Sequence, residues 1–213
     1  MDTDLVQQRI FLLSPANASG IRAAHVMSDK AVSDLAVRLR DGGAPLGEIF
    51  SFMSSLYFRG KLAYARAFSA PPFGTSGVLV ITAGGGLLAA ETLLTLEKLR
   101  QISSGSIDLE NSRYRQPLVR DAQNLLQLIS PDCQIILLGS IATGKYTEPL
   151  LEIFGTRLFF PAEFIGRGDM SRGGLMLQCV STSTQLTYIP VANAILRGAR
   201  PPKLERLRST VQQ

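Results

Sequence analysis

Three short apolar segments, each followed by a loop of small residues, constrain the fold more than any other feature of the sequence. They are residues 9–14, 77–82 and 133–138, and residues 157–160 are a fourth, weaker candidate. Apolar runs of this length, bounded by turn residues, are typical of strands that are buried on both faces of a sheet. The chain therefore offers four strands for a buried central sheet.

Segments with helical periodicity separate these strands. Apolar residues recur every three or four positions in residues 32–39, 45–68 and 112–129, and shorter helices are expected at residues 91–99 and 147–154. Strands that alternate with helices are joined by right-handed crossovers and form a mainly parallel sheet. We therefore predict a Rossmann-like, three-layer α/β/α fold.

Two details of this prediction concern single segments. Gly60 interrupts the long helical segment, where it indicates either a break or a close contact with another helix. Residues 175–180 and 185–189 are apolar and flank the polar stretch 181–184, so we expect them to form a C-terminal antiparallel hairpin at one edge of the sheet.

The charge distribution divides the chain into a single α/β domain, residues 1–196, and a basic C-terminal tail, residues 197–213. Five of the 22 basic residues but only one of the 17 acidic residues lie from Arg197 onward, so the remainder is nearly neutral. A basic, proline-containing tail is either a solvated, flexible arm or a segment that binds nucleic acid. We expect the first.

No apolar run approaches the roughly 20 residues that span a bilayer, and the N-terminus lacks a basic region followed by an apolar one. We therefore expect a cytoplasmic protein that does not enter the membrane. Cys133, Cys179 and His25 are too few and too scattered for a zinc site, so we expect no bound metal and two buried thiols. His25 is either a general base or a structural residue.

Ligands of open α/β sheets bind beyond the carboxyl ends of the strands, where the loops of this chain are rich in small residues. In the loop after the first strand, Ser14 and Asn17 are candidates for polar contacts with a ligand, rather than for a nucleophile. After the second strand, Gly84 and Gly85 either let a ligand approach the backbone or merely turn the chain.

The loop after the third strand, residues 139–145, has the G-x-x-x-x-G-K spacing of a phosphate-binding loop. Its candidate ligand-binding residues are Gly139, Ser140, Gly144 and Lys145. However, Tyr146 stands where a magnesium-binding Ser or Thr is required. This disfavours an ordinary NTPase and leaves a magnesium-independent phosphate contact or a tight turn with a surface lysine.

A fourth glycine-rich stretch, residues 166–174, contains two arginines and an aspartate. Arg167 and Arg172 are candidates for clamping a phosphate or carboxylate, and Asp169 is the candidate catalytic residue or ribose contact. The alternative is an exposed loop in which Asp169 pairs with an arginine. Upstream, a polar-aromatic cluster consists of Tyr57, Arg59, Lys61 and Tyr64. Tyr57 and Tyr64 are seven residues apart and share a helix face, so we expect them beneath or beside the pocket, with nucleic-acid stacking as the weaker alternative.

The order of these motifs resembles a widespread, uncharacterised bacterial family of α/β domains. More distantly, it resembles the uracil-DNA-glycosylase-like core of archaeosine synthase. The resemblance rests on the small-residue loop after the first strand, FRGKLAY, ITAGGGLL, LLGSIATGKY and the glycine-rich stretch at residues 164–174. It implies a nucleobase- or nucleotide-sized pocket. It does not imply base excision, because the water-activating and histidine motifs of true uracil glycosylases are missing.

Together these features predict a protein that binds a nucleotide, nucleoside or other anionic metabolite, as a hydrolase or transferase if it is an enzyme. Two alternatives stay open: a nucleic-acid-binding module that uses the basic tail, and a non-catalytic interaction protein. The sequence specifies no cofactor and no oligomeric state.

Overall fold

The computed structural model describes residues 7–194 and, beyond them, residues 198, 199, 201, 202 and 204. A six-stranded sheet in the order β4-β3-β1-β6-β7-β8 lies at its centre. The four inner strands are parallel and confirm the four predicted strands; they are β1 (Arg9–Leu13), β3 (Val78–Thr82), β6 (Gln134–Leu138) and β7 (Leu158–Pro161). At the two edges, β4 (Gly86–Ala89) and β8 (Tyr188–Pro190) run antiparallel to their neighbours.

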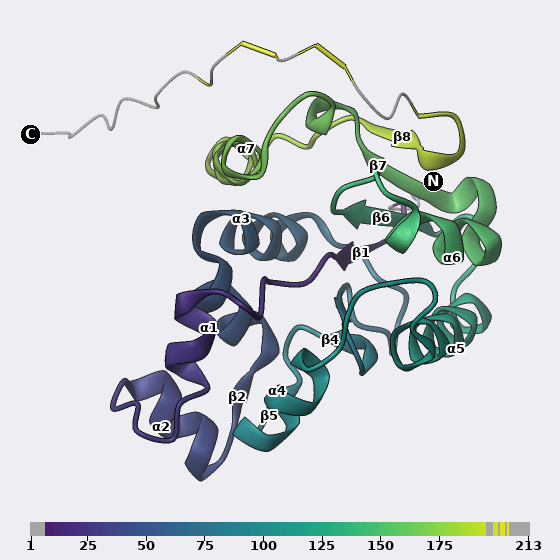
Figure 1. Ribbon diagram of the computed structural model, residues 1–213. Helices are drawn as coiled ribbons and strands as arrows, with labels where there is room; N and C mark the ends of the chain where they lie inside the picture. Colours follow the sequence, from purple (N-terminus) through teal and green to yellow (C-terminus); the bar gives the residue numbers. More distant parts are fainter. Residues whose placement is uncertain (1–6, 195–197, 200, 203, 205–213) are drawn as a thin grey trace, which may run out of the picture.

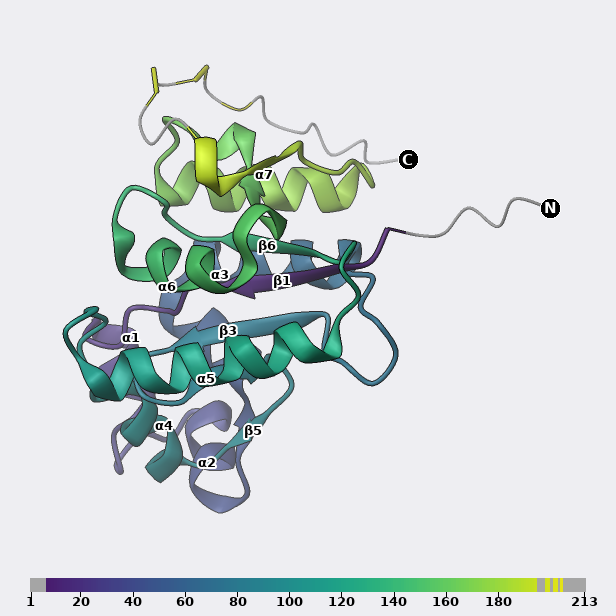
Figure 2. The same ribbon diagram turned by 90° about the vertical axis from the view of Figure 1, so that its right-hand side faces the viewer.

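Helices cover both faces of this sheet and give the three predicted layers (Figure 1). Figure 2 shows two helices in front of the strands, α5 (Ser112–Leu128) and α6 (Gly144–Phe154). Behind the strands lies the long helix α3 (Leu46–Phe68), against which α7 (Asp169–Ser181) packs. The sheet between these layers is the core: Ile10 to Leu13 of β1 and Ile135 to Leu138 of β6 are fully buried.

Smaller elements complete the fold, and several of them depart from the predicted boundaries. They are α1 (Ile21–Val26), α2 (Asp34–Asp41), α4 (Leu96–Ser103), the short strand pair β2 (Ala44–Pro45) and β5 (Leu93–Leu94), and the 3-10 turns Gly155–Arg157, Ala162–Phe164 and Val191–Asn193. The sequence did not reveal α1 or β4. None of the helices in the described part of the chain has the length and apolar character that crossing a bilayer requires.

The predicted strand at residues 175–180 is wrong, because these residues belong to α7. The buried residues of α7, Gly173, Met176 and Cys179, are spaced by three, which is a helical and not a strand periodicity. The expected antiparallel pairing at this edge nevertheless exists. It joins β8 to β7 instead of to residues 175–180, with Phe160 opposite Ile189.

Gly60 marks a close contact between helices and not a break, because α3 continues through it. A Cβ at Gly60 would lie 2.6 Å from the carbonyl oxygen of Gly173, and a Cβ at Gly173 would lie 2.8 Å from that of Leu56. The backbones of α3 and α7 therefore touch at this point. The contact places the first turn of α7, which carries Asp169 and Arg172, beside Tyr57 and Lys61 of α3.

Candidate functional site

A cavity of about 650 Å³ lies beyond the carboxyl ends of the parallel strands. From β1 the chain crosses to β3 on one side, whereas from β6 it crosses to β7 on the other. The loops that follow β1 and β6 therefore diverge and leave a crevice between them, which is where sheets of this kind bind ligands. Ser14 after β1, Ala83 after β3 and Ser140 after β6 all line the cavity.

The cavity wall is polar with aromatic patches. Among the described residues, Lys145 is the one cation and Asp169 the one carboxylate that line it. The other lining groups include the hydroxyls of Ser14, Ser19, Ser54, Ser103, Ser106 and Ser140, the amide of Asn17, and the rings of Phe50, Tyr57 and Tyr146. Its volume lies within the range of roughly 300–1,000 Å³ that is usual for small-molecule sites.

Five of the candidate residues from the sequence meet in this cavity. Ser14, Asn17, Ser140, Lys145 and Asp169 come from the loops after β1 and β6 and from the starts of α6 and α7, and all of them line it. Ser14 is the most buried of the five, with 6% of its surface exposed. Convergence of this kind is what the carboxyl-edge rule predicts for residues that follow parallel strands.

The four candidate glycines do not line the cavity. Gly84 lines a neighbouring hollow of about 640 Å³ that shares Ala83 and Ser106 with it. Gly85 donates its N–H to Thr82 Oγ1 at 2.9 Å within the β3–β4 turn, which matches the turn alternative. Gly139 and Gly144 serve as spacers: a Cβ at Gly139 would lie 3.0 Å from Cβ of Ser14, and one at Gly144 would collide with the carboxylate of Glu148.

The two candidate arginines do not form a clamp. Arg172 donates from Nε and Nη2 to the carbonyl oxygen of Phe164, at 3.2 and 3.0 Å, and its Nη1 lies 3.6 Å from Asp169 Oδ1. Arg167 donates to the carbonyl oxygen of Glu163 and lines a separate hollow of about 420 Å³. Asp169 thus pairs with an arginine, Arg172, as the alternative prediction had it, and it also lines the cavity.

Lys61 is the residue whose importance the sequence reasoning missed. Its side chain is 1% exposed, and Nζ donates to Ser14 at two places, the carbonyl oxygen at 2.5 Å and Oγ at 2.9 Å. Burial lowers the pKa of Lys61 to about 7; the positive charge of Arg172 adds to this effect, and Asp169 opposes it. A signal was present: Lys61 follows Tyr57 by four residues and precedes Tyr64 by three, on the buried face of α3.

Tyr57 adds a buried hydroxyl to the same wall. Among the described residues its Oη has no partner in good hydrogen-bond geometry, although the guanidinium of Arg172 is near enough to lower its pKa somewhat. Burial dominates and raises the pKa of Tyr57 to about 12, and burial likewise raises that of Tyr146 to about 12. Both phenols therefore stay protonated near neutral pH and can donate to a ligand.

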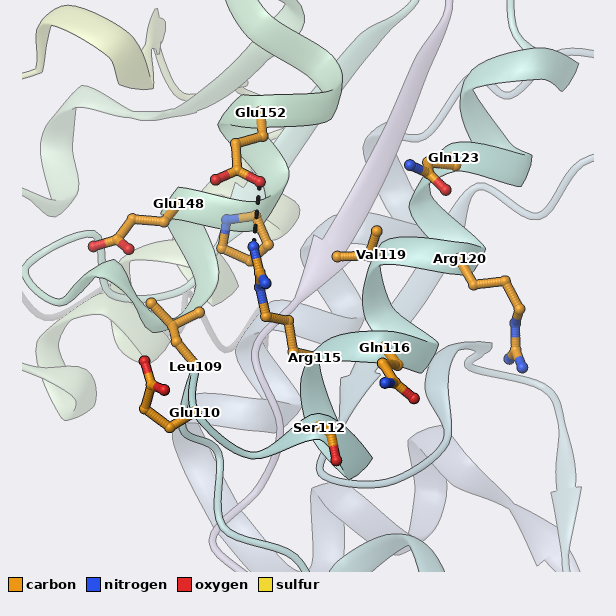
Figure 3. A pocket seen from close by; sticks show the side chains of 11 residues that line it. Leu109, Glu110, Ser112, Arg115, Gln116, Val119, Arg120, Gln123, Glu148 and Glu152 are labelled. Carbon is orange, nitrogen blue, oxygen red and sulfur yellow. Dashed lines mark ion pairs between the residues drawn. The ribbon is translucent and has the colours of Figure 1, made fainter.

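A second hollow, of about 660 Å³, lies between α5 and α6 on the outer helical layer (Figure 3). Figure 3 shows Arg115 of α5 pointing toward Glu152 of α6, and the two form an ion pair at 3.6 Å. The charged residues that line this hollow are exposed and of both signs. None of the candidate residues lines it, so the cavity at the strand ends is the better site.

The remaining sequence features lie away from the cavity. His25 is an exposed residue of α1 beside Phe52, with 6.4 Å between the ring centroids. No cluster of three or more His, Cys, Asp or Glu side chains occurs within the described residues. Cys133 and Cys179 are buried, as expected. The basic residues from Arg197 to Arg208, on which the nucleic-acid alternative depends, lie outside the described residues.

Comparison with known proteins gives no relative for this site. No family model matches the chain, and neither a curated protein nor a solved structure matches it significantly. The functional argument therefore depends on the geometry of the cavity itself.

Proposed function

We propose that this chain binds a nucleoside- or nucleotide-sized metabolite with a negatively charged group, in the cavity beyond β1 and β6. The observation that carries the proposal is the meeting of Ser14, Ser140, Lys145 and Asp169 at the point where the strand order reverses. These residues are far apart in the sequence, and a cavity that gathers hydroxyls, one cation and aromatic rings suits a small polar ligand with a planar part.

Lys145 supplies the positive charge in this proposal. It is the second residue of α6, its Nζ lies 5.3 Å from the centre of the Tyr146 ring, and it forms no ion pair with the described residues. A cation at the first turn of a helix that has no acidic partner among these residues favours a phosphate or carboxylate nearby. The rings of Tyr57, Tyr146 and Phe50 supply apolar faces for a planar base, and Asp169 is placed to accept from sugar hydroxyls.

The proposal does not extend to an NTPase. Tyr146, which takes the place of the magnesium-binding Ser or Thr, is 7% exposed and part of the core. Binding should therefore be unaffected by magnesium chelation. A ligand of this class also fits the cytoplasmic location that we expect from the sequence.

A calorimetric and thermal-shift panel of nucleotides, nucleosides and sugar phosphates tests the proposal. At least one anionic compound should raise the melting temperature, and Lys145→Ala should weaken its binding by roughly tenfold or more, since a hydrogen bond to a charged group contributes about 1.5–3 kcal/mol. The matched control is Lys30→Ala, which removes an exposed lysine in the turn before α2. If no member of the panel stabilises the protein, or if both variants weaken binding equally, the proposal is wrong.

A further inference from the structure

We infer that Ser14 and Lys61 form a nucleophile–base pair, in which Ser14 attacks the carbonyl carbon of a small carboxylic ester bound in the cavity and Lys61 accepts the serine proton. The position of the ester rests on the proposed function, because the negatively charged part of the substrate would bind near Lys145. The chemistry of the pair rests on its own geometry.

The two side chains are arranged as a nucleophile in front of a base. Ser14 lines the cavity, whereas Lys61 is buried behind it, with Nζ 2.9 Å from Ser14 Oγ. The serine is held in place because its N–H donates to the carbonyl oxygen of Leu138 at 3.1 Å and because Gly139 packs against its Cβ. Ser14 therefore has a fixed position at the cavity wall, with 6% of its surface exposed.

The surroundings of Lys61 favour an amine over a permanent ammonium ion. Its side chain is 1% exposed and has no ion pair with a described residue, and both features favour the amine. They act against the two aromatic rings near Nζ, Tyr57 at 4.5 Å and Phe58 at 4.9 Å, which stabilise a cation. The charged groups that act on it, Asp169 and Arg172, both come from α7 and oppose each other. A lysine with a purely structural role usually keeps its charge through a carboxylate partner.

The contact with the carbonyl oxygen of Ser14 orients the base. When Lys61 is neutral, one N–H still donates to this oxygen, at 2.5 Å, and the nitrogen lone pair can accept the proton of Ser14 Oγ. Because burial lowers the pKa of Lys61 to about 7, a large fraction of the molecules hold the neutral amine near neutral pH. A base with a pKa near the working pH is the most effective one.

The reaction balances without a cofactor. Ser14 Oγ forms a bond to the carbonyl carbon while its proton passes to Lys61 Nζ, and the carbonyl electron pair moves onto oxygen. The tetrahedral intermediate collapses, the ester C–O bond breaks, and the leaving alkoxide takes the proton from Lys61. Water then attacks the serine ester with Lys61 again as the base, releases the carboxylic acid and restores Ser14. The net change is ester plus water to acid plus alcohol.

Tyr57 is the residue to stabilise the charge on the carbonyl oxygen. It lies one helical turn before Lys61, lines the same cavity, and its buried hydroxyl lacks a well-aligned partner among the described residues. Its raised pKa keeps it protonated, so it can donate a hydrogen bond to an oxyanion. A bound substrate would thus satisfy a polar group that is otherwise buried without a partner.

A fluorophosphonate probe, which reacts with activated serines independently of the natural substrate, tests this inference. The full chain is incubated with the probe between pH 6 and 9, and the modified peptide is identified by mass spectrometry. We expect a single adduct on Ser14, with a rate that rises with pH around a midpoint near 7, where Lys61 becomes neutral. Ser14→Ala should abolish the adduct, and the matched control Ser130→Ala, which changes an exposed serine far from the cavity, should retain it.

Lys61→Met should lower the labelling rate by about 100-fold or more and remove the pH midpoint, as expected for loss of a general base. If this variant does not fold, Lys61→Arg serves instead, because arginine stays charged and cannot accept the proton. A folded wild-type protein that is not labelled at Ser14, or a Lys61 variant labelled at the wild-type rate, would overturn the inference. Ligand binding retained in such a protein would leave the proposed function intact, so the two failures are distinguishable.

Discussion

Replacing the buried lysine of α3 by an apolar residue should change how the stability of the protein depends on pH. Lys61 has an ordinary pKa of 10.5 and a folded-state pKa of about 7, because burial disfavours its charged form. Between these values the unfolded chain holds a proton that the native state lacks. The contribution of Lys61 to the free energy of unfolding of the wild type must therefore rise with pH in this window.

The size of this effect follows from the width of the window. Where the unfolded chain holds the Lys61 proton and the native state does not, each pH unit adds about 1.4 kcal/mol to the free energy of unfolding. The increase is smaller near pH 7, because the native lysine is still half protonated there. Between pH 7 and pH 8.5 we expect Lys61 to add roughly 1.6 kcal/mol. At higher pH the cysteines and tyrosines, whose pKa values are raised by burial, act in the opposite direction and would mask the lysine.

Urea unfolding of the wild type and of Lys61→Met at pH 6, 7, 8 and 8.5 measures this contribution. The difference between the two free energies should shift in favour of the wild type by roughly 1.6 kcal/mol from pH 7 to 8.5, whichever protein is more stable at pH 7. Lys98→Met, which removes an exposed lysine of α4, is the control and should follow the wild-type pH dependence. Parallel curves for the wild type and Lys61→Met would refute the reasoning that burial holds Lys61 partly neutral.

Three further predictions follow from contacts described above. Gly173→Ala should lower the melting temperature and the free energy of unfolding, the latter by about 1–3 kcal/mol, because the new Cβ would lie 2.8 Å from the backbone of Leu56. The control is Gly168→Ala, which should have a much smaller effect because a Cβ there meets nothing within 4 Å. Tyr57→Phe should leave the free energy of unfolding unchanged or raise it by about 1 kcal/mol, since it removes a buried hydroxyl without a well-aligned partner, yet it should slow any esterase reaction. Native Cys133 should react with a thiol reagent far more slowly than the unfolded protein does, because the thiol is buried and burial raises its pKa.

The fold was largely predictable because its strands and helices carry strong and different periodicities. The continuous apolar runs of β1 and β6 predict strands, and the amphipathic pattern of α5 predicts a helix. The error at residues 175–180 has a physical cause: six residues that contain Leu, Met, Cys and Val satisfy both a buried strand and a helix packed against the core. The helix is favoured by its contact with α3 at Gly60. This contact joins residues more than 100 positions apart, so the local sequence pattern could not predict it.

The candidate site was predictable only in part, for a related reason. Ser14 and Ser140, which follow strands closely, and Lys145, at the start of the next helix, were found because the carboxyl-edge rule needs only the strand positions. The roles of Arg167 and Arg172 depend on whether residues 166–174 are a loop or the start of a helix. In the structure Arg172 lies in the first turn of α7 and Arg167 two residues before it, and both donate to backbone carbonyls. Lys61 was noticed in the sequence, but its bond to Ser14 links two segments that only the tertiary fold brings together.

The glycine contact between α3 and α7 has a consequence for how the cavity can change its shape. Where two backbones touch, no side chain lies between them that could rotate to absorb a sliding movement. The wall formed by Tyr57 and Asp169, together with Lys61 behind it, should therefore behave as one rigid block during ligand entry. Opening and closing of the cavity then depends on the opposite rim, residues 15–19 and 104–107, where the chain has no regular structure.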